Sequence, residues 1–141
     1  MYILDTNVIS ELRKAHNGKA APQVINWAHS VNAGDLYVSV ISLMELELGI
    51  ALVERKDKVQ AQALRTWFEQ QVLPEFSQRT LDINTEVALC CAKLHVPDKR
   101  SERDALIAAT ALVHSMTVVT RNTQDFVHTG VKLINPWQPR P

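Results

Sequence analysis

The chain has 141 residues, of which 46% are hydrophobic, so it is long and apolar enough to form one domain with a buried core and is not a disordered chain. Lys and Arg number 15 and Asp and Glu also number 15, so the formal net charge is zero and does not predict a general electrostatic grip on nucleic acid. No stretch reaches the roughly 20 apolar residues of a membrane span. The N-terminus also lacks the basic segment and apolar run of a signal peptide, so we expect a cytoplasmic protein without a membrane segment.

Short apolar strands alternate with helices along the sequence. In chain order we expect a strand over 2–4, helices over 7–14 and 23–31, a strand over 36–40, helices over 43–55 and 57–72, a weak strand over 79–82, helices over 85–94 and 103–115, a strand over 116–120, a short helix after 121–126, and a last strand over 131–134. This alternation predicts an α/β fold, with a parallel sheet that carries helices on both faces. We expect residues 1–141 to form a single domain.

Local signals set the predicted ends of several helices. Ser42 and Glu45 have the spacing of a capping box, so Ser42 is expected to cap the helix that follows the second strand. Pro74 is expected to end the helix that begins near Asp57, and Asn84 is expected to cap the next one.

Four acidic residues are predicted to meet at one edge of the sheet. Asp5 ends the first strand, and Glu45 lies in the first turn of the helix after the second strand. Asp104 opens the helix that precedes the fourth strand, and Asp125 follows that strand. Helices in right-handed crossover units run antiparallel to the strands, so all four positions fall at the carboxyl edge, where ligands bind in such sheets.

Four carboxylates in one crevice repel one another unless some are protonated or a cation neutralises them. Hard oxygen ligands suit Mg²⁺ or Mn²⁺, and such a site facing a phosphodiester indicates metal-assisted hydrolysis. The neutral polar residues Asn7, Thr120 and Asn122 lie on the same edge and are candidates to hold water or a phosphate oxygen. The alternative for any single acid is an ordinary helix cap or turn residue.

Other candidate residues carry weaker signals. Asp82 also ends a predicted strand and is a rival to the four acids. The basic residues that flank the predicted site could attract RNA, pair with the acids or simply be solvated; they are Lys99, Arg100, Arg103 and Arg121. Cys90 and Cys91 are neighbours in a predicted helix, and we expect both to be buried free thiols.

Four segments together resemble the PIN-domain family. They are YILDTNVISEL, SVISLMELELGI, RDALIAATAL and VVTRNTQDF, and the resemblance is closest to the VapC and FitB type of ribonuclease toxin of bacterial type II toxin–antitoxin modules. The resemblance covers nearly the whole chain. It implies a three-layer α/β/α sandwich with strand order 3-2-1-4-5 and Mg²⁺-dependent endoribonuclease activity.

The same resemblance implies roles for individual residues. Asp5 and Asp104 match the positions most often taken as Mg²⁺ ligands, and Glu45 and Asp125 complete the catalytic acidic pocket. Asn7, Thr120 and Asn122 match the family's supporting polar positions. The family also implies a homodimer or a hetero-oligomer with a VapB-type antitoxin, whose C-terminal tail lies in the active-site groove. We expect a basic antitoxin residue to reach the acids.

Two other function classes stay open at this stage. One is a PIN module that has lost catalysis and binds nucleic acid or protein, although all four acids are present. The other is a phosphoaspartyl protein, which also uses an Asp at the end of the first strand. The sequence Asp5-Thr6-Asn7 lacks the second acid two residues later that such a phosphatase requires.

Overall fold

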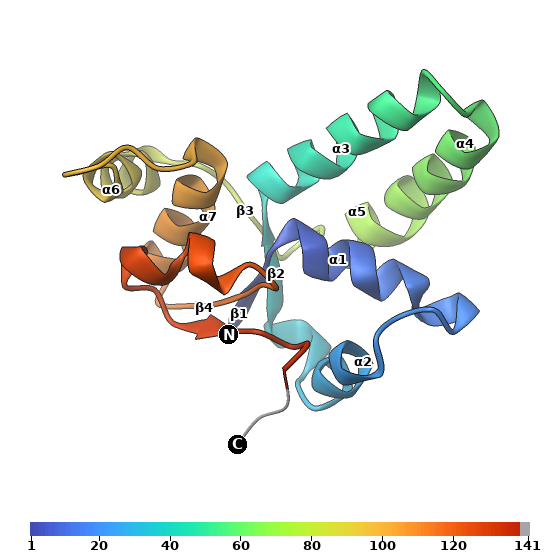
Figure 1. The fold of residues 1–141 in the computed structure, drawn as a ribbon, viewed down its shortest axis with the longest axis horizontal. Coiled ribbons are helices and arrows are strands. Elements are labelled where there is room, and N and C mark those ends of the chain that lie inside the picture. The colour runs from blue at the N-terminus through green and yellow to red at the C-terminus, as the bar shows by residue number, and fades with distance from the viewer. Residues whose placement is uncertain (139–141) are drawn as a thin grey trace.

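The computed structural model describes residues 1–138, in which strands and helices alternate along the chain (Figure 1). Residues 139–141 of the predicted domain lie outside the described residues. The strands are β1 (Tyr2–Leu4), β2 (Leu36–Ser39), β3 (Thr80–Leu81), β4 (Thr117–Val119) and β5 (Leu133–Ile134). The α-helices are α1 (Thr6–Arg13), α2 (Pro22–His29), α3 (Val40–Glu54), α4 (Lys58–Trp67), α5 (Leu73–Glu75), α6 (Thr85–Leu94) and α7 (Glu102–Val113). Single 3₁₀ turns span Lys14–Asn17, Ala33–Asp35, Thr123–Asp125 and Val127–Thr129.

The five strands form one parallel sheet in the order β3-β2-β1-β4-β5, which confirms the predicted topology. The central strand is β1, where Tyr2 is paired with Leu36 of β2 on one side and with Thr117 of β4 on the other. Strands far apart in sequence therefore end side by side, and the residues that follow β1 and β4 meet at the same edge.

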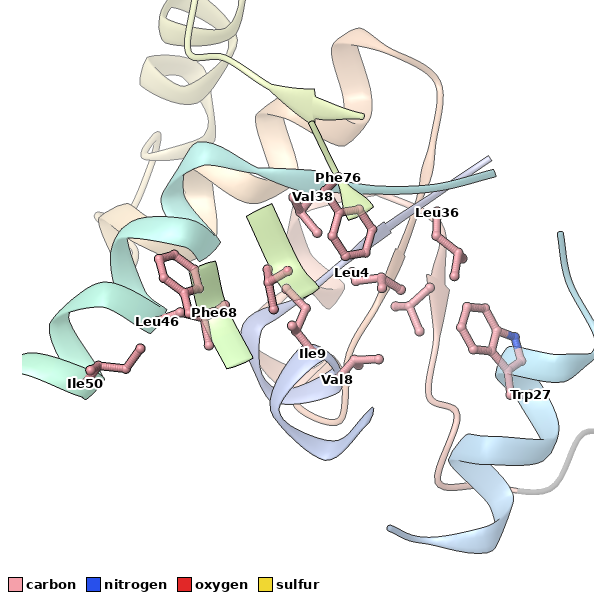
Figure 2. Close-up of a cluster of buried hydrophobic side chains, with 12 residues drawn as sticks. Leu4, Val8, Ile9, Trp27, Leu36, Val38, Leu46, Ile50, Phe68 and Phe76 are labelled. Atoms are coloured by element: carbon pink, nitrogen blue, oxygen red, sulfur yellow. The ribbon is translucent and has the colours of Figure 1, made fainter. Parts of the chain in front are cut away.

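Both faces of the sheet are buried, as expected for a parallel sheet. Successive residues of a strand point to opposite faces, so Leu4 packs with α1, α2 and α3 while Ile3 packs with α7. Val119 and Val118 of β4 divide in the same way, and all four side chains are fully buried. Figure 2 shows the first of these clusters, in which Leu4 lies among side chains of the surrounding helices. The predicted three-layer sandwich is confirmed.

Helices α3 and α4 pack against each other as an antiparallel pair that extends away from the sheet (Figure 1). An ion pair between Arg65 of α4 and Glu47 of α3, with 2.6 Å between Nη1 and Oε2, joins the two helices. Ile50 and Phe68 anchor the pair to the core (Figure 2).

The predicted capping box at Ser42 is wrong. Ser39 is the cap: its backbone is extended, and its side chain accepts a hydrogen bond from the Ile41 N–H at 3.0 Å. The helix therefore begins at Val40. The β-branched residues Val40 and Ile41, which suggest a longer strand in the sequence, belong to its first turn. Ser42 becomes a buried residue inside α3, and its hydroxyl has no hydrogen-bond partner within residues 1–138.

The predicted helix end at Pro74 is also slightly wrong. After α4 the chain forms one π-helical turn, Phe68–Val72, and continues through α5 to Glu75. The N–H of Leu73 bonds to the carbonyl of Phe68, five residues earlier. This wider turn lets the chain pass through a proline, which has no N–H to donate.

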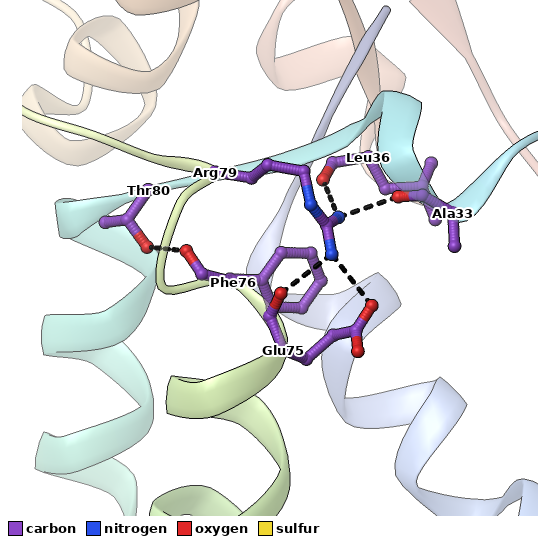
Figure 3. A network of polar contacts seen from close by, with 6 residues as sticks. All are labelled: Ala33, Leu36, Glu75, Phe76, Arg79 and Thr80. Carbon is purple, nitrogen blue, oxygen red and sulfur yellow. Dashed lines mark hydrogen bonds and ion pairs between the residues drawn. The ribbon is translucent and has the colours of Figure 1, made fainter.

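Arg79 ties the start of β2 to the end of α5 (Figure 3). Its guanidinium donates to the backbone carbonyls of Ala33, Leu36 and Glu75, and to the Glu75 carboxylate at 2.8 Å. These hydrogen bonds have a structural role, because they satisfy backbone carbonyls beside the short edge strand β3.

The cysteines form no disulfide. Cys91 is buried in the contact between α6 and α7, as predicted, whereas Cys90 is only half-buried. Burial raises the pKa of the Cys91 thiol, which favours its neutral form. None of the helices within residues 1–138 has the length and apolar character needed to cross a membrane.

We expect Phe126→Ala to destabilise the fold by about 3–5 kcal/mol, because Phe126 is fully buried against the α7 face of the sheet. The neighbouring substitution Val127→Ala should cost less than about 0.5 kcal/mol, because Val127 is exposed. Urea unfolding of both variants checks this, and equal losses for the pair would contradict the packing described.

Candidate active site

Asp5 follows β1 directly and is the most buried acid of the predicted site, with 6% of its surface exposed. Its backbone N–H donates to the Val119 carbonyl of β4 at 2.9 Å, which fixes it between the two central strands. Its Oδ1 accepts the Thr6 N–H at 2.8 Å and so also caps α1. Burial raises the pKa of Asp5, while hydrogen bonds from Thr120 and Thr6 oppose that rise.

Thr120 and Asn7 hold the other oxygen of Asp5. The Thr120 hydroxyl donates to Oδ2 at 2.8 Å, and the Asn7 amide donates to the same oxygen at 3.3 Å. Asn122 joins through its backbone, since its N–H donates to the Thr120 hydroxyl at 3.0 Å. The structure therefore brings the three predicted polar residues together around Asp5, although Asn122 does so without its side chain.

Glu45 reaches the same region from α3, although it lies beyond the first turn of that helix and not within it as predicted, because α3 begins at Val40. Its Oε1 accepts a hydrogen bond from the Thr6 hydroxyl at 2.7 Å, so Thr6, whose N–H donates to Asp5, links the two carboxylates. Its Oε2 lies 3.6 Å from Nη1 of Arg103 in α7. The sequence analysis missed Thr6, and the only available signal was its place between Asp5 and Asn7.

Asp104 lies in the first turn of α7 and is partly buried. Burial, together with the negative charges of Asp5, Asp125 and Glu45, raises the pKa of Asp104 to about 6. Each of the other three acids therefore lies near enough to repel the Asp104 carboxylate, as the topology predicted.

Asp125 is the outermost of the four acids. It ends the 3₁₀ turn Thr123–Asp125 after β4, and it is exposed. Within residues 1–138 its side chain makes no hydrogen bond to the other three acids, and its link to Asp104 is electrostatic.

The four acids do not form a ready-made metal cage: in the part of the chain that the structure describes, no three His, Cys, Asp or Glu side chains converge closely enough to hold a metal ion. Mg²⁺ needs no such cage, because it commonly binds one or two carboxylates and keeps several waters. The available ligands are carboxylate oxygens, with hydroxyl and amide groups beside them. Burial and repulsion between the acids raise the pKa of Asp5 and Asp104, so a bound cation would stabilise their charged forms. This donor chemistry fits Mg²⁺ or Mn²⁺.

A hollow of about 710 Å³ opens beside the acids, between α3 and α7. Glu45, Arg103 and Asp104 contribute polar groups to its wall, and Ile41, Met44 and Leu106 contribute apolar ones. A ligand could therefore reach the acidic edge from this side.

Of the remaining sequence candidates, Arg121 adjoins this arrangement through its backbone N–H, which donates to the Asn7 amide oxygen at 3.2 Å. Asp82 follows β3 and is exposed. The Arg100 backbone N–H donates to the ring of His95 at 3.0 Å, and the Arg121 guanidinium lies 5.1 Å from the Trp137 ring centre.

We predict that Asp104 makes the stability of the metal-free protein fall as pH rises from about 4 to above about 6. Its pKa is raised from 3.8 in the folded protein, so across this interval the native state binds more protons than the unfolded state. In excess chelator, Asp104→Asn should therefore be more stable than the wild type at pH 7.5, with the advantage shrinking toward pH 4. Urea unfolding across this range checks it, and a difference that does not vary with pH would contradict the electrostatic strain.

Comparison with known proteins identifies relatives over the full length. The chain is 39% identical to the toxin FitB of Neisseria gonorrhoeae over 143 residues, which cover 97% of this chain and 99% of FitB. It is 37% identical to the VapC ribonuclease Y4jK of Sinorhizobium fredii, over 99% of both chains.

Solved structures agree with these relatives. The FitAcB crystal structure from Neisseria gonorrhoeae contains a chain that superposes with a TM-score of 0.88 at 35% identity, covering 99% of this chain and all of that one. A chain of FitAB bound to a DNA fragment gives a TM-score of 0.87 at 36% identity, over 100% of this chain and 99% of that one. Residues 2–132 match the sequence profile of the PIN-domain family. The chain therefore belongs to the PIN-domain family, and its relatives lie in the FitB and VapC branch.

Proposed function

We propose that this protein is an Mg²⁺-dependent endoribonuclease, the toxin of a type II toxin–antitoxin module. The observation that carries the proposal is the buried Asp5 carboxylate, held by Thr120 and Asn7 at an edge where three more acids gather. Full-length similarity to a protein named as a VapC ribonuclease supports RNA as the substrate.

Asp5 and Asp104 would hold the cation, as Mg²⁺ or alternatively Mn²⁺. When bound, the ion would lower the pKa of an attacking water and stabilise negative charge on the phosphate. Thr120 and Asn7 fix the Asp5 carboxylate in one orientation, which a productive site requires. Glu45, held by Thr6, and the outer Asp125 would orient water or accept a proton.

The proposed partner is an antitoxin of the VapB or FitA type. The supporting observation is that similar chains were solved in FitAcB and in FitAB bound to a DNA fragment. We propose that the antitoxin tail enters the groove beside the acids and places a basic residue against them, because the carboxylates lack full neutralisation. Free cysteines are consistent with action in the reducing cytoplasm.

The proposed homodimer would form through α3. Met44, Leu48 and Leu52 follow one another at four-residue intervals along this helix, and between 41% and 57% of each residue is exposed. Such a stripe on one helical face is a candidate protein interface, and a second copy of the chain would cover it.

The alternative is a PIN module that binds nucleic acid or protein without cleaving it. The four acids and their supporting hydrogen bonds favour the enzyme. Burial of the Asp5 carboxylate destabilises the fold, and a module that only binds would not require a buried acid at this position. Absence of metal-dependent cleavage by the folded, antitoxin-free protein would favour the alternative.

We predict that Asp5→Asn lowers RNA cleavage by at least about 100-fold, because it removes a charge from the centre of the site. Excess chelator should abolish cleavage by the wild type. The matched control is Asp82→Asn, another acid that follows a strand but lies exposed, and it should cleave like the wild type. Gel analysis of total bacterial RNA measures this, and cleavage that survives both chelator and Asp5→Asn would contradict the proposed site.

We predict that Leu48→Glu converts the dimer to a monomer by placing charges in the apolar stripe on α3. Sedimentation velocity on the antitoxin-free protein measures the change. Leu89→Glu, at an exposed leucine of α6, is the control and should stay dimeric. A wild type that sediments as a monomer would rule out the homodimer.

A further inference from the structure

Arg103 forms an ion pair with Glu45, one of the four acids. It precedes Asp104 in the first turn of α7, and its Nη1 lies 3.6 Å from Oε2 of Glu45. This separation exceeds the roughly 2.7–2.9 Å of a charge-assisted hydrogen bond. The Arg103 side chain is 48% exposed, so the pair is loose and faces solvent.

Two other arginines show what a structural role looks like in this protein. Arg79 has its donors engaged by three carbonyls and a carboxylate (Figure 3). Arg65 forms a close pair with Glu47 at 2.6 Å that joins α3 to α4. The Arg103 side chain, in contrast, makes no hydrogen bond within residues 1–138 and has one long ion pair. Its guanidinium donors remain available to a ligand.

The helix itself does not favour Arg103 at this position. The N-terminal end of an α-helix carries a partial positive charge, so a cation in the first turn is electrostatically unfavourable there. What attracts the guanidinium is the carboxylate cluster in front of it. Its position is thus explained by the site rather than by the stability of α7.

The hollow between α3 and α7 gives the ligand a place. Arg103 lines its wall together with the acids Glu45, Glu102 and Asp104, and Ile41 and Leu106 add apolar side chains. Its volume of about 710 Å³ lies in the range of small-molecule sites. A nucleotide offers both matching features, a phosphate for the guanidinium and a base for the apolar wall.

We propose that Arg103 binds a backbone phosphate of the RNA next to the one that is cleaved, and that Glu45 holds Arg103 in the free protein and releases it when RNA arrives. This inference rests on the proposed ribonuclease function. The exchange is a change of partners for one guanidinium, from a carboxylate at 3.6 Å to a phosphate that it can contact with two donors. Binding of RNA also becomes less repulsive, because the cation then faces the polyanion.

The test measures RNA binding without cleavage. The parent is Asp5→Asn in excess chelator, and the probe is a fluorescent single-stranded RNA made from a sequence that the wild type cuts. Adding Arg103→Ala should weaken binding about 10-fold and reduce the salt slope of log affinity by about 0.7, the share of one phosphate contact. Adding Arg65→Ala, which breaks the other ion pair of α3, should leave affinity and slope unchanged.

A second arm tests the exchange with Glu45. Glu45→Gln in the same parent should tighten RNA binding, since Arg103 no longer has a competing carboxylate. The tightening should be smaller when Arg103→Ala is also present. Arg103→Lys keeps the positive charge but loses the planar guanidinium, so its RNA affinity should lie between those of the parent and the Arg103→Ala variant. Thermal unfolding verifies that each variant is folded.

The outcomes separate this inference from the ribonuclease proposal. If the wild type cleaves RNA but Arg103→Ala binds it as tightly as the parent, the phosphate contact is overturned and the hollow is left to a protein partner. If Arg103→Ala weakens binding but Glu45→Gln does not tighten it, the exchange is overturned. If the wild type neither binds nor cleaves RNA, both proposals fail.

Discussion

The hydrogen bond from Thr120 to Asp5 joins residues 115 positions apart, and the arrangement of the site depends on it. It exists because β1 and β4 are neighbours in the sheet and end at the same edge. The bond gives a buried carboxylate a donor that offsets part of its desolvation. It does not neutralise the charge, and the same topology brings Glu45, Asp104 and Asp125 to the same edge. The fold thus concentrates negative charge at one place in a chain with no net charge.

The acids were predictable because their positions follow from chain topology. Strand ends and helix starts can be read from hydrophobic patterns, and parallel order then gathers them at one edge. Ser39 was missed as a cap because Val40 and Ile41 have the β-branched character of a strand, and nothing in the pattern marks where extension gives way to helix. The π turn before Pro74 buries Phe68 and Val72, and this tertiary packing cannot be read from the local sequence pattern.

The finer organisation of the site was beyond sequence reasoning for a related reason. The role of Thr6 comes from the distance between α1 and α3, and Asn122 contributes an N–H that every residue but proline possesses. The basic residues show the same limit. Arg103 and Arg121 looked alike in the sequence, yet one faces Glu45 and the other lies over Trp137. Their partners depend on side-chain directions that no spacing rule provides.

Thermal unfolding of the antitoxin-free protein at pH 7.5, in millimolar Mg²⁺ and in excess EDTA, tests whether the crowded carboxylates form a cation site. A ligand that binds only the native state raises its stability, and relief of the repulsion around Asp104 is the physical source of that gain. We predict that Mg²⁺ raises the unfolding midpoint of the wild type by several degrees and leaves that of Asp104→Asn nearly unchanged. Equal wild-type midpoints in Mg²⁺ and EDTA would contradict it.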